Sequence, residues 1–196
     1  MKKLSMFCMV MLVALSAGQA FALPGVYRAG PPTMDLYVGQ CETRTISMDG
    51  TGWGTSPLVS GGFGIMQSDD GATVDITTCQ CYDGTLTPAI WDPGTLIVFD
   101  PTGYPGGLFV AAVNLDAGVT PSANILLCDV TFCGVDYGTA TIVIDTVPDF
   151  DTWIGCSALP CNDWTVYDPN IDAAIINVEA TTWHCECGVF GPIQVQ

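Results

Sequence analysis

Short apolar runs separated by turn-forming residues make up most of the chain. The runs are rich in Val, Ile and Thr, which favour strands, and turn sequences such as DDG, DPG and PTGYPGG lie between them. In residues 139–145, Ala140, Ile142 and Ile144 alternate with polar positions, apart from Val143, which predicts a strand with one buried and one wet face. The predicted strands are residues 72–78, 95–99, 107–115, 123–132, 139–145, 164–167 and 173–181.

Two of these runs are apolar at both odd and even positions. Residues 107–115 and 123–132 read GLFVAAVNL and ANILLCDVTF, as expected of strands enclosed between layers. Many short strands, 22 glycines and 13 prolines indicate an all-β fold. The length suits one domain, and no repeat or linker marks a second. We therefore expect a single two-layer β-sandwich over residues 23–196, with a cysteine-containing C-terminal tail.

The first 22 residues have the features of a secretory signal peptide. Lys2 and Lys3 precede an apolar run over residues 6–15, and an A-x-A sequence follows at residues 20–22. The run is too short to span a membrane, and no other segment reaches about 18 apolar residues. We expect cleavage after residue 22 and a secreted product, located outside the cell, at its surface or in the periplasm.

The net charge narrows the classes of partner. Cleavage removes Lys2 and Lys3 and leaves Arg28 and Arg44 against 20 acidic residues, so the formal charge falls from −16 to −18. Nucleic acids and anionic lipid surfaces would repel such a chain. The remaining expectation is a protein or polysaccharide partner outside the cytoplasm.

Nine cysteines remain after removal of Cys8 with the signal peptide. In an exported chain they are expected to form disulfides, which also limit the entropy of the unfolded state. The odd number leaves at least one cysteine free or linked to another chain, which allows a disulfide-linked oligomer. The candidates are Cys41, Cys79, Cys81, Cys128, Cys133, Cys156, Cys161, Cys185 and Cys187.

The spacing of the cysteines favours some pairings over others. The ends of the CSALPC loop, Cys156 and Cys161, are predicted to bond. Cys128 and Cys133 have opposite parity on a strand and would need a bulge or a turn to meet.

The other four cysteines form two Cys-x-Cys pairs. The two side chains of such a pair point to one face of a strand and should bond elsewhere. Cys79 or Cys81 with Cys185 or Cys187 would fasten the tail to the domain. A zinc or other thiophilic site that includes His184 is the less favoured interpretation, because the spacings match no known finger or ribbon.

An acidic segment before the last predicted strand is a candidate calcium site. Asp168, Asn170, Asp172 and Glu179 are spaced as the first, third, fifth and twelfth places of an EF-hand loop. Ala173 replaces the required glycine, however, and the flanking sequences favour strands over helices. We therefore interpret the segment as a turn at whose tip Asp168, Asn170 and Asp172 could hold calcium without Glu179. The second acidic turn, SDDG at residues 68–71, is interpreted as an Asx turn.

The sequence offers few groups for catalysis. His184 is the only histidine and no lysine remains after cleavage, so most schemes lack a base. The acids could supply a glycosidase pair, but no pair stands out. We predict that the protein is not an enzyme, with a secreted glycoside-active enzyme as the least favoured alternative.

Two tryptophans beside turns are candidates for carbohydrate binding. Trp53 lies in DGTGWGTS and Trp91 in AIWDPG, where exposed rings would stack on sugars. Burial in the core is the competing and favoured interpretation.

Four segments, in order, resemble a bacterial cohesin-type domain. They read GGFGIMQSDDGATVDITTC, YPGGLFVAAVNLDAG, ANILLCDVTFC and YGTATIVID, and the resemblance covers about residues 34–180. It implies a jelly-roll sandwich of about nine strands, a fold shared with carbohydrate-binding modules, and a non-catalytic role in adhesion or assembly. We expect an exported binding or assembly module that contacts protein or carbohydrate; the alternative is a disulfide-linked structural subunit of a surface layer or filament. The resemblance assigns no binding residues.

Overall fold

Every regular element in the described part of the chain is a strand. The computed structural model describes residues 25–93, 95–99, 106–146, 153–156, 164–167 and 171–182. No helix in these ranges is long and apolar enough to cross a membrane. The strands are β1 (Val26–Arg28), β2 (Thr33–Tyr37), β3 (Cys41–Asp49), β4 (Leu58–Gln67), β5 (Val74–Cys81), β6 (Leu96–Phe99), β7 (Leu108–Val113), β8 (Ile125–Gly134), β9 (Gly138–Asp145), β10 (Trp153–Cys156), β11 (Trp164–Tyr167) and β12 (Ala174–Thr181).

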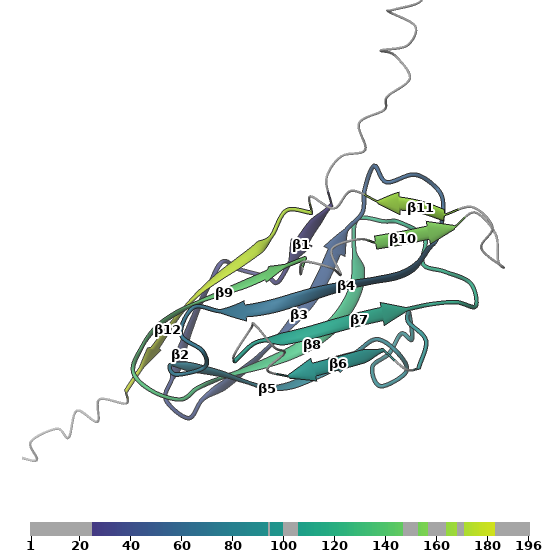
Figure 1. The fold of residues 1–196 in the computed structure, drawn as a ribbon. Helices are drawn as coiled ribbons and strands as arrows, with labels where there is room; N and C mark the ends of the chain where they lie inside the picture. The colour runs from purple at the N-terminus through teal and green to yellow at the C-terminus, as the bar shows by residue number, and fades with distance from the viewer. Residues whose placement is uncertain are drawn as a thin grey trace, which may run out of the picture.

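These strands form two sheets that pack face to face (Figure 1). The four-stranded sheet has the order β1-β3-β8-β5. The larger sheet has the order β11-β10-β4-β9-β12-β2, and β7 with its neighbour β6 is attached through β4. All pairs within these sheets are antiparallel except β12 with β2, which run parallel from Asn177 opposite Thr33 to Thr181 opposite Tyr37.

The predicted all-β sandwich is confirmed, and each predicted strand corresponds to an observed one. In β9, Ala140, Ile142 and Ile144 are buried as the alternation predicted. The expected number of about nine strands is too low, because the described residues contain twelve. The missed elements include β3, whose CETRTISMD sequence is largely polar, and β4, whose LVSGGFGIMQ sequence contains three glycines.

The core lies between the sheets and has large aromatic side chains at one end. Trp153 of β10 is fully buried, and its indole Nε1 donates a 3.0 Å hydrogen bond to the Tyr27 hydroxyl. Burial raises the pKa of Tyr27. The indole lies directly against Gly61 of β4, where a Cβ atom would be 2.2 Å from Trp153 Cδ2. The glycine is therefore required for this close approach.

Candidate functional site

The outer face of the four-stranded sheet carries a row of threonines. We call this surface the threonine face; it comprises Thr43 and Thr45 of β3, Thr131 of β8, and Thr77 and Thr78 of β5. Thr131 lies at its centre, where its Oγ1 shares a 2.9 Å hydrogen bond with Thr43 Oγ1 and accepts a 2.8 Å bond from Thr78 Oγ1. Three neighbouring strands are thus joined by hydroxyl groups across their outer surface.

An aspartate continues this hydroxyl network along β8. Asp129 Oδ1 accepts a 2.7 Å hydrogen bond from Thr45 Oγ1 and a 3.3 Å bond from the Tyr82 hydroxyl. Burial, followed by the nearby Asp129 carboxylate, raises the pKa of Tyr82. The network fixes side chains that a polar partner would contact. Its sequence signal is Thr-x-Thr in CETRTIS and Thr-Thr in VDITTC, and neither pattern alone predicts that these threonines share one surface.

A disulfide fastens the same face. Cys41 of β3 and Cys133 of β8 stand directly opposite each other, with Cα atoms 4.1 Å apart, and they are bonded. The sequence predicted no partner for Cys41. Cys128 and Cys133 do have opposite parity, as predicted: Cys133 lies on the outer side, whereas Cys128 is fully buried. They do not bond to each other.

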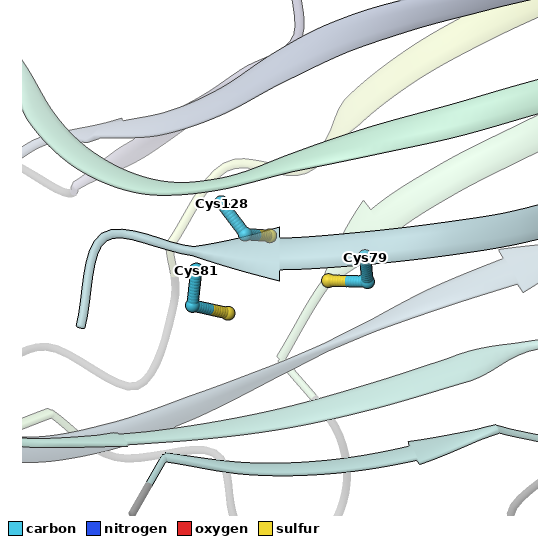
Figure 2. Close-up of side chains that lie close together, drawn as sticks. All are labelled: Cys79, Cys81 and Cys128. Atoms are coloured by element: carbon cyan, nitrogen blue, oxygen red, sulfur yellow. The ribbon is translucent and has the colours of Figure 1, made fainter. Parts of the chain in front are cut away.

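Three cysteines without disulfides meet on the inner side of the sheet. Cys79 and Cys81 of β5 and Cys128 of β8 are free, and their sulfur atoms lie within 4.8 Å of one another. Figure 2 shows the three side chains gathered where these neighbouring strands run together. We call this group the thiol cluster. The predicted bond from Cys79 or Cys81 to the tail is not formed in this structure, because both thiols are directed into the sandwich toward Cys128.

A bulge in β5 directs the two cysteines inward. Ile76 pairs with Phe132 and Thr78 with Thr131, so Thr77 is an extra residue without a partner in β8. Strict alternation from buried Val74 and Ile76 would have turned Cys79 and Cys81 outward. The extra residue restores their direction toward the core, which sequence periodicity could not reveal.

The thiol cluster is mostly buried and its thiols affect one another. Cys128 and Cys81 are 0% and 2% exposed, whereas Cys79 is partly exposed. Hydrogen bonds from the Cys128 and Cys79 thiols lower the pKa of Cys81 to about 5. Burial, followed by hydrogen bonds with Cys79 and Cys81, raises the pKa of Cys128. Of these two buried thiols, Cys81 is therefore the one whose thiolate its neighbours favour.

Both arginines in the described part of the chain are paired with acids. Arg28 Nη2 lies 2.6 Å from Asp49 Oδ2, and Arg44 Nε lies 2.6 Å from Glu42 Oε1. Asp49 also accepts hydrogen bonds from Thr51, which together with Arg28 lower its pKa to about 2. The described surface consequently presents no unpaired arginine to an anionic partner.

Trp53 and Trp91 are buried, as the favoured interpretation predicted, and the alternative of exposed sugar-binding rings is wrong. They are only 4% and 2% exposed. Trp53 stacks on Tyr167 with ring centroids 4.9 Å apart, and Trp91 Nε1 donates a 2.9 Å hydrogen bond to the Leu126 carbonyl. Burial of a large indole ring is favourable once its N–H has a partner, as at Trp91. Neither ring forms a platform for sugars in this structure.

The structure describes the two predicted acidic turns to different extents. Asp172 is exposed and its backbone pairs with the N-terminal segment, since its amide donates to the Gly25 carbonyl and its carbonyl accepts from the Tyr27 amide. Asp168 and Asn170 lie outside the described residues, so the calcium site stays a prediction. Glu179 lies on the exposed side of β12. In the SDDG turn, the Ala72 amide donates to the Asp69 carbonyl, and Asp69 Oδ2 accepts a 2.6 Å hydrogen bond from the Thr73 amide. This bond reaches four residues along the chain and not the two of the predicted Asx turn.

The remaining predicted residues are largely beyond the described ranges. Cys156 is disulfide-bonded, and its predicted partner Cys161 lies outside those ranges. The same is true of His184, Cys185 and Cys187, and of the signal peptide.

Comparisons with known proteins find likeness in structure and none in sequence. No protein-family model and no curated protein matches this sequence. The seventh type I cohesin of ScaB from Pseudobacteroides cellulosolvens has a TM-score of 0.57 at 12% identity, covering 88% of this chain and 97% of that one. The OlpA cohesin of a type I cohesin–dockerin complex from Clostridium thermocellum has a TM-score of 0.53 at 13% identity, with coverage of 81% and 99%.

A third similar structure is the third cohesin of ScaC in complex with the ScaB dockerin, from Acetivibrio cellulolyticus. Its TM-score is 0.53 at 11% identity, and the alignment covers 80% of this chain and 99% of that one. At these identities the likeness shows the fold. The chain has a jelly-roll β-sandwich of the cohesin type, as the sequence resemblance predicted.

Proposed function

We propose that this chain is an exported, non-catalytic module that binds a protein partner through its threonine face. The cohesin-type fold supports a binding role, because two of the similar structures are cohesins in complex with dockerins. The N-terminal segment, with its basic start and apolar run, supports export.

The observation that carries the proposal is the construction of the threonine face. Its hydroxyls are held by hydrogen bonds across three strands, and the Cys41–Cys133 disulfide fixes two of these strands to each other. A rigid surface loses little conformational entropy on binding, which favours affinity. Hydroxyl groups that can both donate and accept hydrogen bonds suit the polar contacts of a protein interface.

The charge of the chain indicates the kind of partner. Asp75 and Asp129 lie on the same side of the sheet as the threonines, and both described arginines are already paired. We expect a partner surface with lysines and arginines, whose association is steered by charge and weakened by salt. A carbohydrate partner is less favoured, since Trp53 and Trp91 are buried.

The test is a binding assay against a panel of recombinant dockerin modules that includes basic ones. Thr78→Arg places a bulky cation on the threonine face, and the matched control Thr139→Arg places the same side chain at an exposed position of β9 in the other sheet. We expect Thr78→Arg to weaken binding at least about tenfold, the effect of 1.4 kcal/mol, and Thr139→Arg to change it less than about twofold. Equal effects of the two variants, or binding by no module, would contradict the proposal.

A further inference from the structure

The geometry points to the thiol cluster as a binding site for one soft metal ion, Cu⁺, held by the sulfur atoms of Cys79, Cys81 and Cys128. The three sulfurs lie within 4.8 Å of one another. A metal–sulfur bond of about 2.3 Å places three ligand sulfurs about 3.8–4.0 Å apart. Small side-chain adjustments are therefore enough to bring all three sulfurs onto one ion.

The strand pairing holds the three sulfurs together. Cys81 and Cys128 are directly opposite in the β5–β8 ladder, and Cys79 lies two residues before Cys81 on the same side. The Thr77 bulge is necessary for this arrangement, because it turns both β5 cysteines inward. Bulges are local distortions that strands retain where they direct a side chain to a site.

The set of ligands selects the class of metal. All three donors are sulfur, which favours soft ions such as Cu⁺ over calcium or magnesium, the ions that prefer oxygen. Zinc usually takes four protein ligands in a closed site. No further His, Cys, Asp or Glu joins the group among the residues that the structure describes. A three-sulfur site matches Cu⁺, which accepts trigonal coordination.

The surroundings suit a monovalent cation. Cys81 and Cys128 belong to the hydrophobic core and Cys79 packs against it, so water has little access to the ion. The partly exposed side of Cys79 provides the entry path. Copper enters and remains as Cu⁺, each thiol that becomes a thiolate ligand releases its proton to water, and no electron is transferred.

A disulfide between two of the three cysteines is the competing explanation. Cys81 and Cys128 face each other closely, yet they are unbonded in a structure where Cys41 with Cys133, and Cys156, form disulfides. Any disulfide within the group would leave the third sulfur as a single thiol and abolish the site. The two explanations predict different thiol counts and different copper stoichiometries.

The experiment uses the full mature chain, purified without oxygen and with its disulfides intact, titrated with Cu⁺ supplied as its acetonitrile complex against a competing chelator. We expect one Cu⁺ per chain, a sulfur-to-copper charge-transfer band, and an X-ray absorption spectrum that fits three sulfurs. Cys79→Ser, at the partly exposed position, and Cys128→Ser should each lower the affinity at least about 100-fold. If the buried Cys128→Ser variant fails to fold, Cys79→Ser still tests the proposal.

The matched control is Cys185→Ser/Cys187→Ser, which removes the other Cys-x-Cys pair and should bind copper as the unmodified chain does. Unchanged affinity in Cys79→Ser would overturn the proposal, as would loss of binding in the tail variant. The same holds if intact mass and alkylation of the secreted protein show a disulfide within the thiol cluster. Protection of three thiols from alkylation by bound Cu⁺ would support it independently of affinity.

Discussion

Single residues determine how closely neighbouring elements of this sandwich pack. Gly61 admits the Trp153 indole, and Trp153 in turn bonds to Tyr27 of the first strand. Because Gly61 has no side chain, the Trp153 indole of β10 can lie against β4 and also reach Tyr27 of β1. A residue with a Cβ atom at this position would push a fully buried ring into a densely packed core.

Replacing Gly61 with alanine should lower the free energy of unfolding by about 1–3 kcal/mol, the usual cost of overpacking. The matched control is Gly54→Ala, because a Cβ atom at Gly54 meets nothing within 4 Å. We expect a change below about 0.5 kcal/mol there. Urea unfolding followed by tryptophan fluorescence measures both, and an equal loss in the two variants would contradict the packing argument.

Asp49 should contribute to stability in a pH-dependent manner. Its pKa falls from 3.8 to about 2 on folding, mainly because Thr51 donates hydrogen bonds to it and Arg28 lies beside it. Between these values the unfolded state binds more protons than the native state. The contribution is therefore complete above about pH 4 and is lost as the pH falls toward 2.

Asp49→Asn should consequently flatten the loss of stability between pH 4 and pH 2, measured as urea midpoints at several pH values. In Thr51→Val, which keeps the carboxylate but loses a hydroxyl donor, NMR titration should give a higher pKa for Asp49. An Asp49→Asn variant whose acid dependence equals that of the unmodified chain would contradict this assignment.

At the scale of elements, alternation along a strand was readable from the sequence where large aliphatic residues alternate with polar ones, as in β9, but not in the largely polar β3. Residues 139–145 were predicted from the alternation of their apolar positions, and residues 173–181 as the strand that follows an acidic turn. Burial alternates in both β9 and β12. The inward direction of Cys79 and Cys81 was not readable, because it depends on the Thr77 bulge. The Cys41–Cys133 pair depends on the register between β3 and β8, which is a property of the assembled sheet.

Two consecutive isoleucines in β12, one buried and one exposed, allow a direct test of the alternation of burial along this strand. Ile176 is 1% exposed and Ile175 is 51% exposed. Ile176→Ala should cost about 2–5 kcal/mol of unfolding free energy, because it removes buried methylene groups and leaves a cavity. Ile175→Ala should cost less than about 0.5 kcal/mol. Urea unfolding of both variants distinguishes them, and similar losses would show that β12 does not pack as described.

For the whole molecule, the fold class followed from the sequence, whereas the binding surface did not. Short strands and turns predicted the sandwich. The threonine face combines residues from three strands that are distant in the chain, since Thr43 and Thr131 are 88 positions apart and Thr78 and Thr131 are 53 apart. Only the strand order brings these hydroxyls together. The same long separation makes the Cys41–Cys133 disulfide a constraint on the entire chain, because it closes a loop with a sequence separation of 92.

The double variant Cys41→Ser/Cys133→Ser should therefore unfold with a free energy lower by about 4–5 kcal/mol, the loop-closure entropy that the bond removes from the unfolded chain. The control is Thr43→Ser/Thr131→Ser, which alters the opposite pair two residues along the same strands and should cost less than about 1 kcal/mol. Both are measured in urea without reductant. A loss below about 1 kcal/mol in the cysteine variant would contradict the entropic account.

The position of β12 also affects when this molecule can finish folding. β12 is the last strand among the described residues, yet it lies between β9 and β2, and in that part of the chain β2 pairs within its sheet only with β12. Until residues 174–181 emerge during synthesis, β2 has no partner in its sheet. One hydrogen-bonding edge of β9 is also unpaired until then. The nascent chain should therefore remain accessible to chaperones until residues 174–181 have been made.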